Sequence, residues 1–142
     1  MYKTNWKIKA LAICLLVVFA AMVQIQAQAA EDGTPAVKIA EKEGLGRYLT
    51  DPNGMTLYYF TKDSSNKSAC SGFCLERWPL FYSEVAVVPA GCDASDFNVI
   101  TREDGKKQTT YKDKPLYYYE KDKEPGDTKG QGVFDSWYVV AP

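Results

Sequence analysis

The chain has 142 residues, with 17 Lys or Arg against 18 Asp or Glu, and it contains no histidine. Without histidine, Ser-His-Asp and Cys-His nucleophile pairs, His-ligated zinc or copper sites and C-x-x-C-H haem attachment are excluded. A nucleic-acid-binding protein is also disfavoured, because its Lys and Arg would gather into one stripe, whereas the lysines here are interspersed with acids.

Residues 1–29 have the layout of a secretory signal peptide. Lys3, Lys7 and Lys9 precede an apolar run over positions 10–23, and Ala27-Gln28-Ala29 offers a cleavage site. The run is too short to favour a permanent membrane span, and Cys14 follows Ile13 rather than the small residue that lipid attachment requires. We therefore predict an exported protein, periplasmic or extracellular, without a stable membrane span after cleavage. Loss of the three lysines would change the net charge from −1 to −4.

The mature chain divides into a short arm and one domain. Residues 30–44 are charged and irregular and predict a flexible amino-terminal arm, in which alternation around Val37 and Ile39 would suit a short strand over 36–40. Residues 45–142 predict a single β domain, with a first repeat over about 45–82, a linker over about 83–96 and a second repeat over about 97–142.

Strand and turn signals follow one another along the domain. The first repeat predicts strands over 46–50 and 55–62, separated by a turn at Asp51-Pro52-Asn53-Gly54. A linking strand is expected over 80–89, and a hairpin over 97–101 and 107–111 turns at Asp104-Gly105. Strands over 116–119 and 137–140 complete the chain. Sustained apolar spacing of three and four residues is missing, so helix is a minor component.

An internal repeat organises these elements. Leu57, Tyr58, Tyr59 and Phe60 recur as Leu116, Tyr117, Tyr118 and Tyr119, and the same shift along the chain carries Asp63 onto Asp122 and Trp78 onto Trp137. Both faces of each aromatic strand are apolar, so we expect these to be the two central strands. The fold class predicted is all-β, a mainly antiparallel small domain of two pseudo-twofold-related repeats, sandwich or barrel-like, with little helix.

The two repeated aspartates each open a polar run. Aspartate in such a place captures backbone N–H groups and closes a loop, so we expect a structural role for Asp63 and Asp122. A carboxylate pair could alternatively hydrolyse a glycoside if held about 5–10 Å apart.

Three cysteines remain after signal cleavage. In an exported protein, cysteine pairs form disulfides. Cys92 is then unpaired, or bonds Cys70 or Cys74, or links two chains in a weak dimer.

The pattern Tyr-x-(Phe/Trp/Tyr)-x-x-Asp occurs as Tyr58-x-Phe60-x-x-Asp63 and as Tyr117-x-Tyr119-x-x-Asp122. Together with Cys70-Ser71-Gly72-Phe73-Cys74 and Trp78-Pro79, it resembles a bacterial secreted-repeat family of predicted lipoproteins with a conserved YX(FWY)XXD motif. The resemblance covers about residues 45–142 and implies a disulfide between Cys70 and Cys74. It implies no activity, because the family has no established biochemical function.

Three function classes fit these observations. The protein would be a non-catalytic binding module whose exposed aromatics, a Tyr from each repeat with Trp78 or Trp137, hold a glycan or envelope ligand. Alternatively, it is a structural or protein-partner component of the cell envelope, or a hydrolase using Asp63 and Asp122. We expect no enzyme, no cofactor and no metal, although a calcium site at Asp122, Glu124 and Asp127 is a lesser variant.

Overall fold

The computed structural model describes residues 35–84 and 87–142, and the predicted signal peptide lies outside them. The first described element is a hairpin of β1 (Lys38–Lys42) and β2 (Gly46–Thr50), paired from Lys38 with Thr50 to Lys42 with Gly46. Because β1 is paired along its length and Val37 before it is fully buried, the fold begins ahead of position 45. The strand itself covers Lys38–Lys42, two residues later than the predicted range 36–40.

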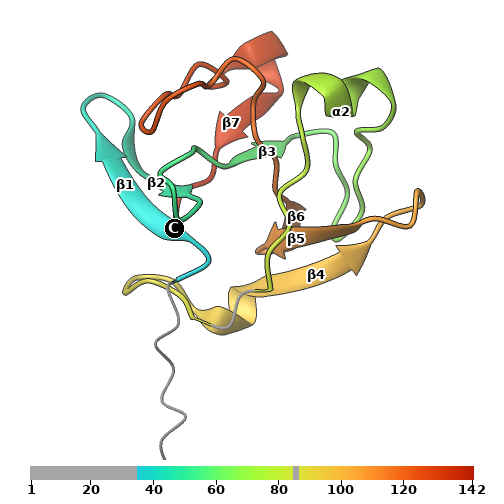
Figure 1. The fold of residues 1–142 in the computed structure, drawn as a ribbon, viewed down its shortest axis with the longest axis horizontal. Helices are drawn as coiled ribbons and strands as arrows, with labels where there is room; N and C mark the ends of the chain where they lie inside the picture. The colour runs from blue at the N-terminus through green and yellow to red at the C-terminus, as the bar shows by residue number, and fades with distance from the viewer. Residues whose placement is uncertain (1–34, 85–86) are drawn as a thin grey trace, which may run out of the picture. The chain divides into compact units, whose positions relative to one another are not determined.

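The second repeat opens on a matching hairpin. Strands β4 (Phe97–Thr101) and β5 (Lys107–Tyr111) pair in antiparallel register, which confirms the hairpin predicted around Asp104-Gly105. The short strand β6 (Lys114–Pro115) extends this sheet beyond β5. In Figure 1 this sheet and the β1–β2 hairpin lie on either side of a third pair of strands.

That third pair joins the two repeats. Strand β3 (Tyr58–Phe60) pairs antiparallel with β7 (Trp137–Val139), so Tyr59 faces Tyr138 and Phe60 faces Trp137. The equivalent pairing in the other half of the domain is reduced to one isolated bridge, Tyr117 with Leu80, which corresponds to the pair Tyr58–Val139. Pro79 occupies the position equivalent to Tyr138 and accepts from the Tyr118 N–H at 2.7 Å. Pro79 has no N–H to return, so this pair lacks the second hydrogen bond of a regular antiparallel ladder.

Two predicted strands are therefore wrong as regular elements. The segment 116–119 contributes bridges at Tyr117 only, and the linking strand over 80–89 contributes a bridge at Leu80 within its described residues. Helix is minor, as expected: α2 (Phe73–Arg77) and the 3₁₀ turns η2 (Ala94–Asp96) and η3 (Val133–Asp135) are all short.

Paired backbone hydrogen bonds establish the pseudo-twofold relation between the repeats. Tyr58 and Tyr117 exchange N–H···O bonds, both of 2.9 Å, across the local axis. Farther out, the Thr61 N–H donates to Ser136 O and the Glu120 N–H donates to Arg77 O, each at 2.8 Å and at equivalent positions of the two repeats. The all-β, antiparallel, two-repeat fold is thus confirmed, while the described sheets of two, two and three strands do not join into a closed barrel.

Two apolar clusters fill the interior. One is built from apolar and aromatic side chains in or next to the strands, and we call it the hairpin cluster: Val37, Leu49, Leu57, Phe81, Phe97, Tyr111, Leu116 and Val140. The other gathers at the local axis and consists largely of motif residues: Tyr58, Cys70, Trp78, Tyr117, Tyr119 and Trp137.

Candidate functional site

The motif tyrosine of each repeat is hydrogen-bonded to the motif aspartate of the other. The Tyr58 hydroxyl donates to Asp122 Oδ2 at 2.6 Å, and the Tyr117 hydroxyl donates to Asp63 Oδ2 at 2.8 Å. Each phenolic oxygen has a second contact from a loop, because Gly130 N–H donates to Tyr58 at 3.2 Å and the Ser68 hydroxyl lies 2.6 Å from that of Tyr117. The motif thus joins the two repeats to each other rather than stabilising each repeat alone.

The remaining oxygen of each aspartate closes the loop that it opens. Asp63 Oδ1 accepts from Ala69 N–H at 2.7 Å, and Asp122 Oδ1 accepts from Lys129 N–H at 3.0 Å. Both bonds close loops longer than the usual Asx turn. All four carboxylate oxygens are therefore engaged in holding the backbone and the tyrosines.

Burial governs the protonation of these groups. Desolvation raises the pKa of Asp63 and of Asp122, although the hydrogen bonds from tyrosine and backbone oppose that rise. Desolvation, followed by the hydrogen bond to Asp122, raises the pKa of Tyr58 above its ordinary value, and burial does the same for the pKa of Tyr117. At neutral pH both phenols are protonated donors, which suits a structural hydrogen bond rather than a nucleophile.

Four motif rings form one continuous stack on the local axis. Trp78 and Trp137 lie face to face with ring centroids 3.8 Å apart and an interplanar angle of 2°. Phe60 stacks outside Trp137 and Tyr119 stacks outside Trp78, both at 4.2 Å. Such contacts contribute roughly 0.5–1.5 kcal/mol each beyond area burial.

Burial of this stack agrees with the expectation that the two aromatic strands are central, and it contradicts the alternative that a Tyr from each repeat with Trp78 or Trp137 presents a ligand-binding face. Tyr58 and Tyr117 are 0% exposed and both tryptophans are 3% exposed. Of the eight motif residues, Phe60 and Asp63 remain partly exposed, and both line the same surface hollow. Any ligand contact by the motif is therefore confined to the first repeat.

The disulfide implied by the resemblance is present. Cys70 bonds Cys74, with their Cα atoms 5.3 Å apart, and it holds the start of α2 against Trp78, whose N–H donates to Cys74 O at 2.8 Å. In the second repeat Gly130 takes the place of Cys70, because each follows the residue whose N–H bonds the motif aspartate, Lys129 or Ala69. A Cβ on Gly130 would lie 2.7 Å from the Tyr58 ring, so a cysteine would not fit at this position. Among the described residues Cys92 is unpaired, and it packs half-buried against the hairpin cluster.

Comparison with protein families identifies the chain. The model of a secreted repeat of unknown function matches it twice, over residues 40–81 and 98–141. The chain belongs to this secreted-repeat family. Neither the curated proteins nor the solved structures contain a match. Residues 35–84 and 87–142 hold no helix with the length and apolarity to cross a membrane.

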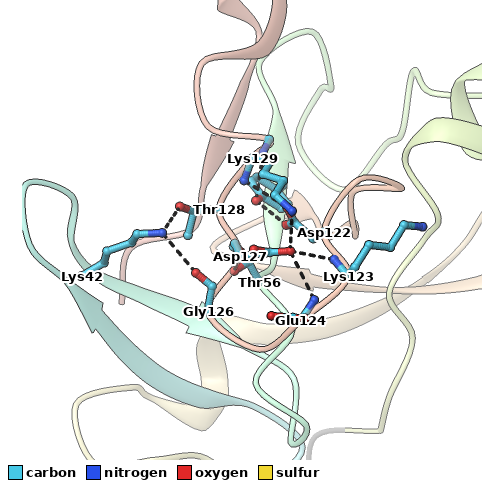
Figure 2. A network of polar contacts seen from close by, with 11 residues as sticks. Lys42, Thr56, Asp122, Lys123, Glu124, Gly126, Asp127, Thr128 and Lys129 are labelled. Atoms are coloured by element: carbon cyan, nitrogen blue, oxygen red, sulfur yellow. Dashed lines mark hydrogen bonds and ion pairs between the residues drawn. The ribbon is translucent and has the colours of Figure 1, made fainter.

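The acidic loop of this secreted-repeat protein, which the sequence suggested as a lesser calcium site, is occupied by its own donors (Figure 2). Asp127 Oδ2 accepts from Lys123 N–H at 2.8 Å, from Glu124 N–H at 3.2 Å and from Lys129 Nζ at 2.9 Å. The bond from Lys129, followed by those from the backbone, lowers the pKa of Asp127 to about 2. Over the described residues, no three acidic or cysteine side chains are grouped as metal ligands.

Contacts from the first repeat anchor the same loop. Lys42 Nζ donates to Gly126 O at 3.2 Å and to Thr128 Oγ1 at 3.0 Å, while Thr56 Oγ1 donates to Asp127 O at 2.5 Å. Figure 2 shows Lys42 reaching this loop from the β1–β2 hairpin. The loop therefore contributes to the joint between repeats.

A surface hollow adjoins the exposed end of the motif. It has a volume of about 490 Å³ and combines two aromatic rings with hydroxyl and charged side chains; its lining is Tyr59, Phe60, Thr61, Asp63, Ser64, Ser65, Lys112, Asp113 and Lys114. We call it the Phe60 hollow. The sequence did not predict this hollow, because Lys112 and Lys114 of the second repeat lie beside Phe60 only when the two repeats pack together.

A second hollow of about 500 Å³ lies beside Arg102 and is lined by Ser71, Lys67 and Glu103 among others, without an aromatic ring. The Arg102 guanidinium is already bonded to Gln108 Oε1 and to Cys70 O, both at 2.6 Å. Its charge serves the fold, so the Phe60 hollow is the stronger candidate for a binding site.

Proposed function

We propose that this secreted-repeat protein is a non-catalytic binding module that works in the periplasm or outside the cell, and that it holds a glycan of the envelope in the Phe60 hollow. The observation that carries the proposal is the position of Phe60, which stacks on Trp137 at 4.2 Å while it remains partly exposed and lines the hollow. An aromatic ring braced from behind offers a flat apolar face of the kind on which sugar rings pack.

The polar lining complements that face. Hydroxyls of Thr61, Ser64 and Ser65 surround the rings and can exchange hydrogen bonds with sugar hydroxyls. A non-catalytic role is supported by the motif carboxylates, since both oxygens of Asp63 and of Asp122 are engaged by tyrosine and backbone donors. A hydrolase would require a carboxylate with a free oxygen aimed at the substrate.

Filling the hollow tests the proposal. Ser65 lies at its exposed edge, and Ser71 lines the hollow beside Arg102, so Ser65→Trp and Ser71→Trp are matched substitutions at two surface positions. We expect the purified protein to bind at least one member of an array of envelope polysaccharides and peptidoglycan fragments. Ser65→Trp should weaken that binding at least about tenfold, the equivalent of about 1.4 kcal/mol, while Ser71→Trp should leave it unchanged. Loss of binding in Ser71→Trp alone, or no binding by the parent protein, would reject the proposal.

A structural or partner-binding role in the envelope is the alternative, and Cys92 is the residue that favours it. This cysteine is half-buried and forms no disulfide within residues 35–84 and 87–142. A dimer linked through it would appear as a reducible band of double mass on non-reducing electrophoresis, and Cys92→Ser would abolish that band.

A further inference from the structure

Two lysines stand between the Phe60 hollow and a smaller neighbour. Lys112, Lys114 and Tyr59 line the Phe60 hollow and also a smaller hollow of about 170 Å³, which is distinct from the one beside Arg102. This smaller hollow continues to Tyr111 and to Ala141 near the carboxyl end. The two hollows therefore share one wall. A ligand longer than one sugar ring could occupy both while it passes the two ammonium groups.

Neither ammonium group forms an ion pair in the described part of the chain, although the Tyr111 hydroxyl and, farther away, Asp96 raise the pKa of Lys112. Other exposed lysines pair with acids, as Lys67 does with Glu103 and Lys107 with Glu84. Lys114 Nζ instead lies 4.1 Å from the centroid of the Tyr59 ring, and Lys112 Nζ lies 4.9 Å from that of Tyr111. A ring attracts a cation by roughly 0.5–1 kcal/mol at an exposed site, yet it leaves the positive charge uncompensated.

The two acids that line the Phe60 hollow have hydrogen-bond partners of their own. Asp63 is bonded through both oxygens to Ala69 N–H and the Tyr117 hydroxyl. Asp113 Oδ1 accepts from Asn66 Nδ2 at 2.8 Å. No side-chain bond to Asp113 Oδ2 is present among the described residues, so the lining offers a new partner two lysines and one carboxylate oxygen. At physiological ionic strength the Debye length is about 8 Å, so these nearby charges matter more to a bound ligand than the chain's overall acidity.

The backbone that presents the lysines is strained. Lys112 and Asp113 both have positive φ, 47° and 64°, a conformation that costs roughly 1–2 kcal/mol for a residue with a Cβ. At the corresponding turn of the first repeat, Gly54 adopts φ 86° without that penalty. Lys112 and Asp113 form the two-residue turn between β5 and β6, and a hairpin turn of this kind requires positive φ at both positions. The turn geometry therefore fixes the backbone of both residues at the wall of the hollow.

From these observations we infer that the ligand is an acidic glycan, a polymer of sugars that carry carboxylates, with sugar rings against Phe60 and Tyr59 and carboxylates on Lys112 and Lys114. This inference rests on the proposed function and names its ligand class. The aromatic lining favours a ligand with ring faces, which an inorganic polyphosphate lacks. The lysine pair favours a ligand with negative charge, which a neutral glycan lacks.

Oligogalacturonate and its methyl ester form a matched pair of probes, because esterification removes the charges and retains the sugars. The variant Lys112→Gln/Lys114→Gln removes two positive charges at the shared wall. The variant Lys106→Gln/Lys121→Gln removes two at exposed positions outside both hollows and gives the same net charge. Calorimetry or thermophoresis on the purified protein then compares the three proteins.

We expect the parent protein to bind oligogalacturonate at least about tenfold more tightly than the ester, and binding to weaken as salt is added. The Lys112/Lys114 variant should lose that preference, whereas the Lys106/Lys121 variant should keep it. Equal affinity for acid and ester, unaffected by the Lys112/Lys114 change, would overturn the acidic assignment while the binding of glycans stood. Equally tight binding of inorganic polyphosphate would overturn the assignment to a sugar polymer. Failure of every glycan to bind would instead remove the proposed function itself.

Discussion

Tyr58 of the first repeat and Asp122 of the second are joined by a hydrogen bond of 2.6 Å, and Asp122 is 7% exposed. The reciprocal pair, Tyr117 with Asp63, is joined at 2.8 Å. The tyrosine of each motif copy therefore bonds the aspartate of the other copy. These tyrosine and aspartate positions link the repeats, which explains why a motif repeated in sequence need not form two independent sites.

Removal of the Tyr58 hydroxyl should destabilise the fold. Tyr58→Phe leaves Asp122 Oδ2 and Gly130 N–H without their partner, and a buried group left unpaired costs about 1–3 kcal/mol, more when charged. We expect the free energy of unfolding, measured by urea titration, to fall by about 2–3 kcal/mol. Tyr82→Phe, at an exposed position, should change it by less than about 0.5 kcal/mol. Equal effects from the two variants would contradict a structural role for the crossed pair.

The pH dependence of stability should differ in sign between two aspartates. Burial raises the pKa of Asp122 above its ordinary value of 3.8, so between the two values the folded state holds more protons than the unfolded state. The stability contributed by this group is present below about pH 4 and is lost as the pH rises through the folded pKa. Asp127, whose pKa is lowered to about 2, contributes stability above its ordinary value that is lost as the pH falls toward about 2.

Urea titrations between about pH 2 and pH 6 check both signs. Relative to Asp122→Asn, the parent protein should lose stability as the pH rises. Relative to Asp127→Asn, it should gain. Slopes of the same sign for the two comparisons would show that burial does not dominate at Asp122.

A single methyl group at Gly130 should disturb the motif cluster. A Cβ there would lie 2.7 Å from two Tyr58 ring carbons and 3.0 Å from the Trp78 ring. Overpacking of this kind costs about 1–3 kcal/mol. Gly105→Ala serves as the comparison, because its Cβ would meet open space and only its φ of 78° is strained. We expect near-ultraviolet circular dichroism of the tryptophan pair to change in Gly130→Ala and to be retained in Gly105→Ala.

Relief of strain at the lysine turn should stabilise the protein. Asp113→Gly places glycine at φ 64°, as Gly54 is placed in the first repeat, and should raise the free energy of unfolding by about 1 kcal/mol. Gly54→Ala should lower the free energy of unfolding by more than that gain, because alanine would be strained at φ 86° and its Cβ would approach Pro125 Cβ at 3.0 Å. A destabilised Asp113→Gly variant would mean that the bond from Asn66 to Asp113 outweighs the backbone strain.

The disulfide should contribute modestly. Cys70 and Cys74 are close in sequence, and loop-closure entropy for so short a loop corresponds to about 2 kcal/mol. Cys70→Ala/Cys74→Ala should lose about that amount in urea titrations, and dithiothreitol should have no further effect on the variant. A loss far above that value would indicate that the bond also maintains α2 and the packing of Trp78.

The sequence by itself determined the two-repeat, antiparallel β architecture and the secreted-repeat family. Those conclusions follow from local signals: a constant spacing between matching motifs, alternating aromatic residues, and turns such as Asp104-Gly105 that set a hairpin without help from distant residues. The cysteine pair was read correctly from the family motif. The strand predicted over 80–89 was wrong, because a strand depends on a partner and this segment pairs only at Leu80 within its described residues.

Only the tertiary structure decided which residues face one another across the local axis. Alternation predicts that Tyr58 and Phe60 share a face, but it does not say that Tyr58 becomes fully buried against Asp122 while Phe60 stays at the surface. The crossed tyrosine–aspartate pairs, the four-ring stack and the lysines beside Phe60 all join residues of different repeats. Such contacts depend on how the two copies pack, and that packing is set by side-chain volume and loop closure around the axis rather than by the pattern within either copy.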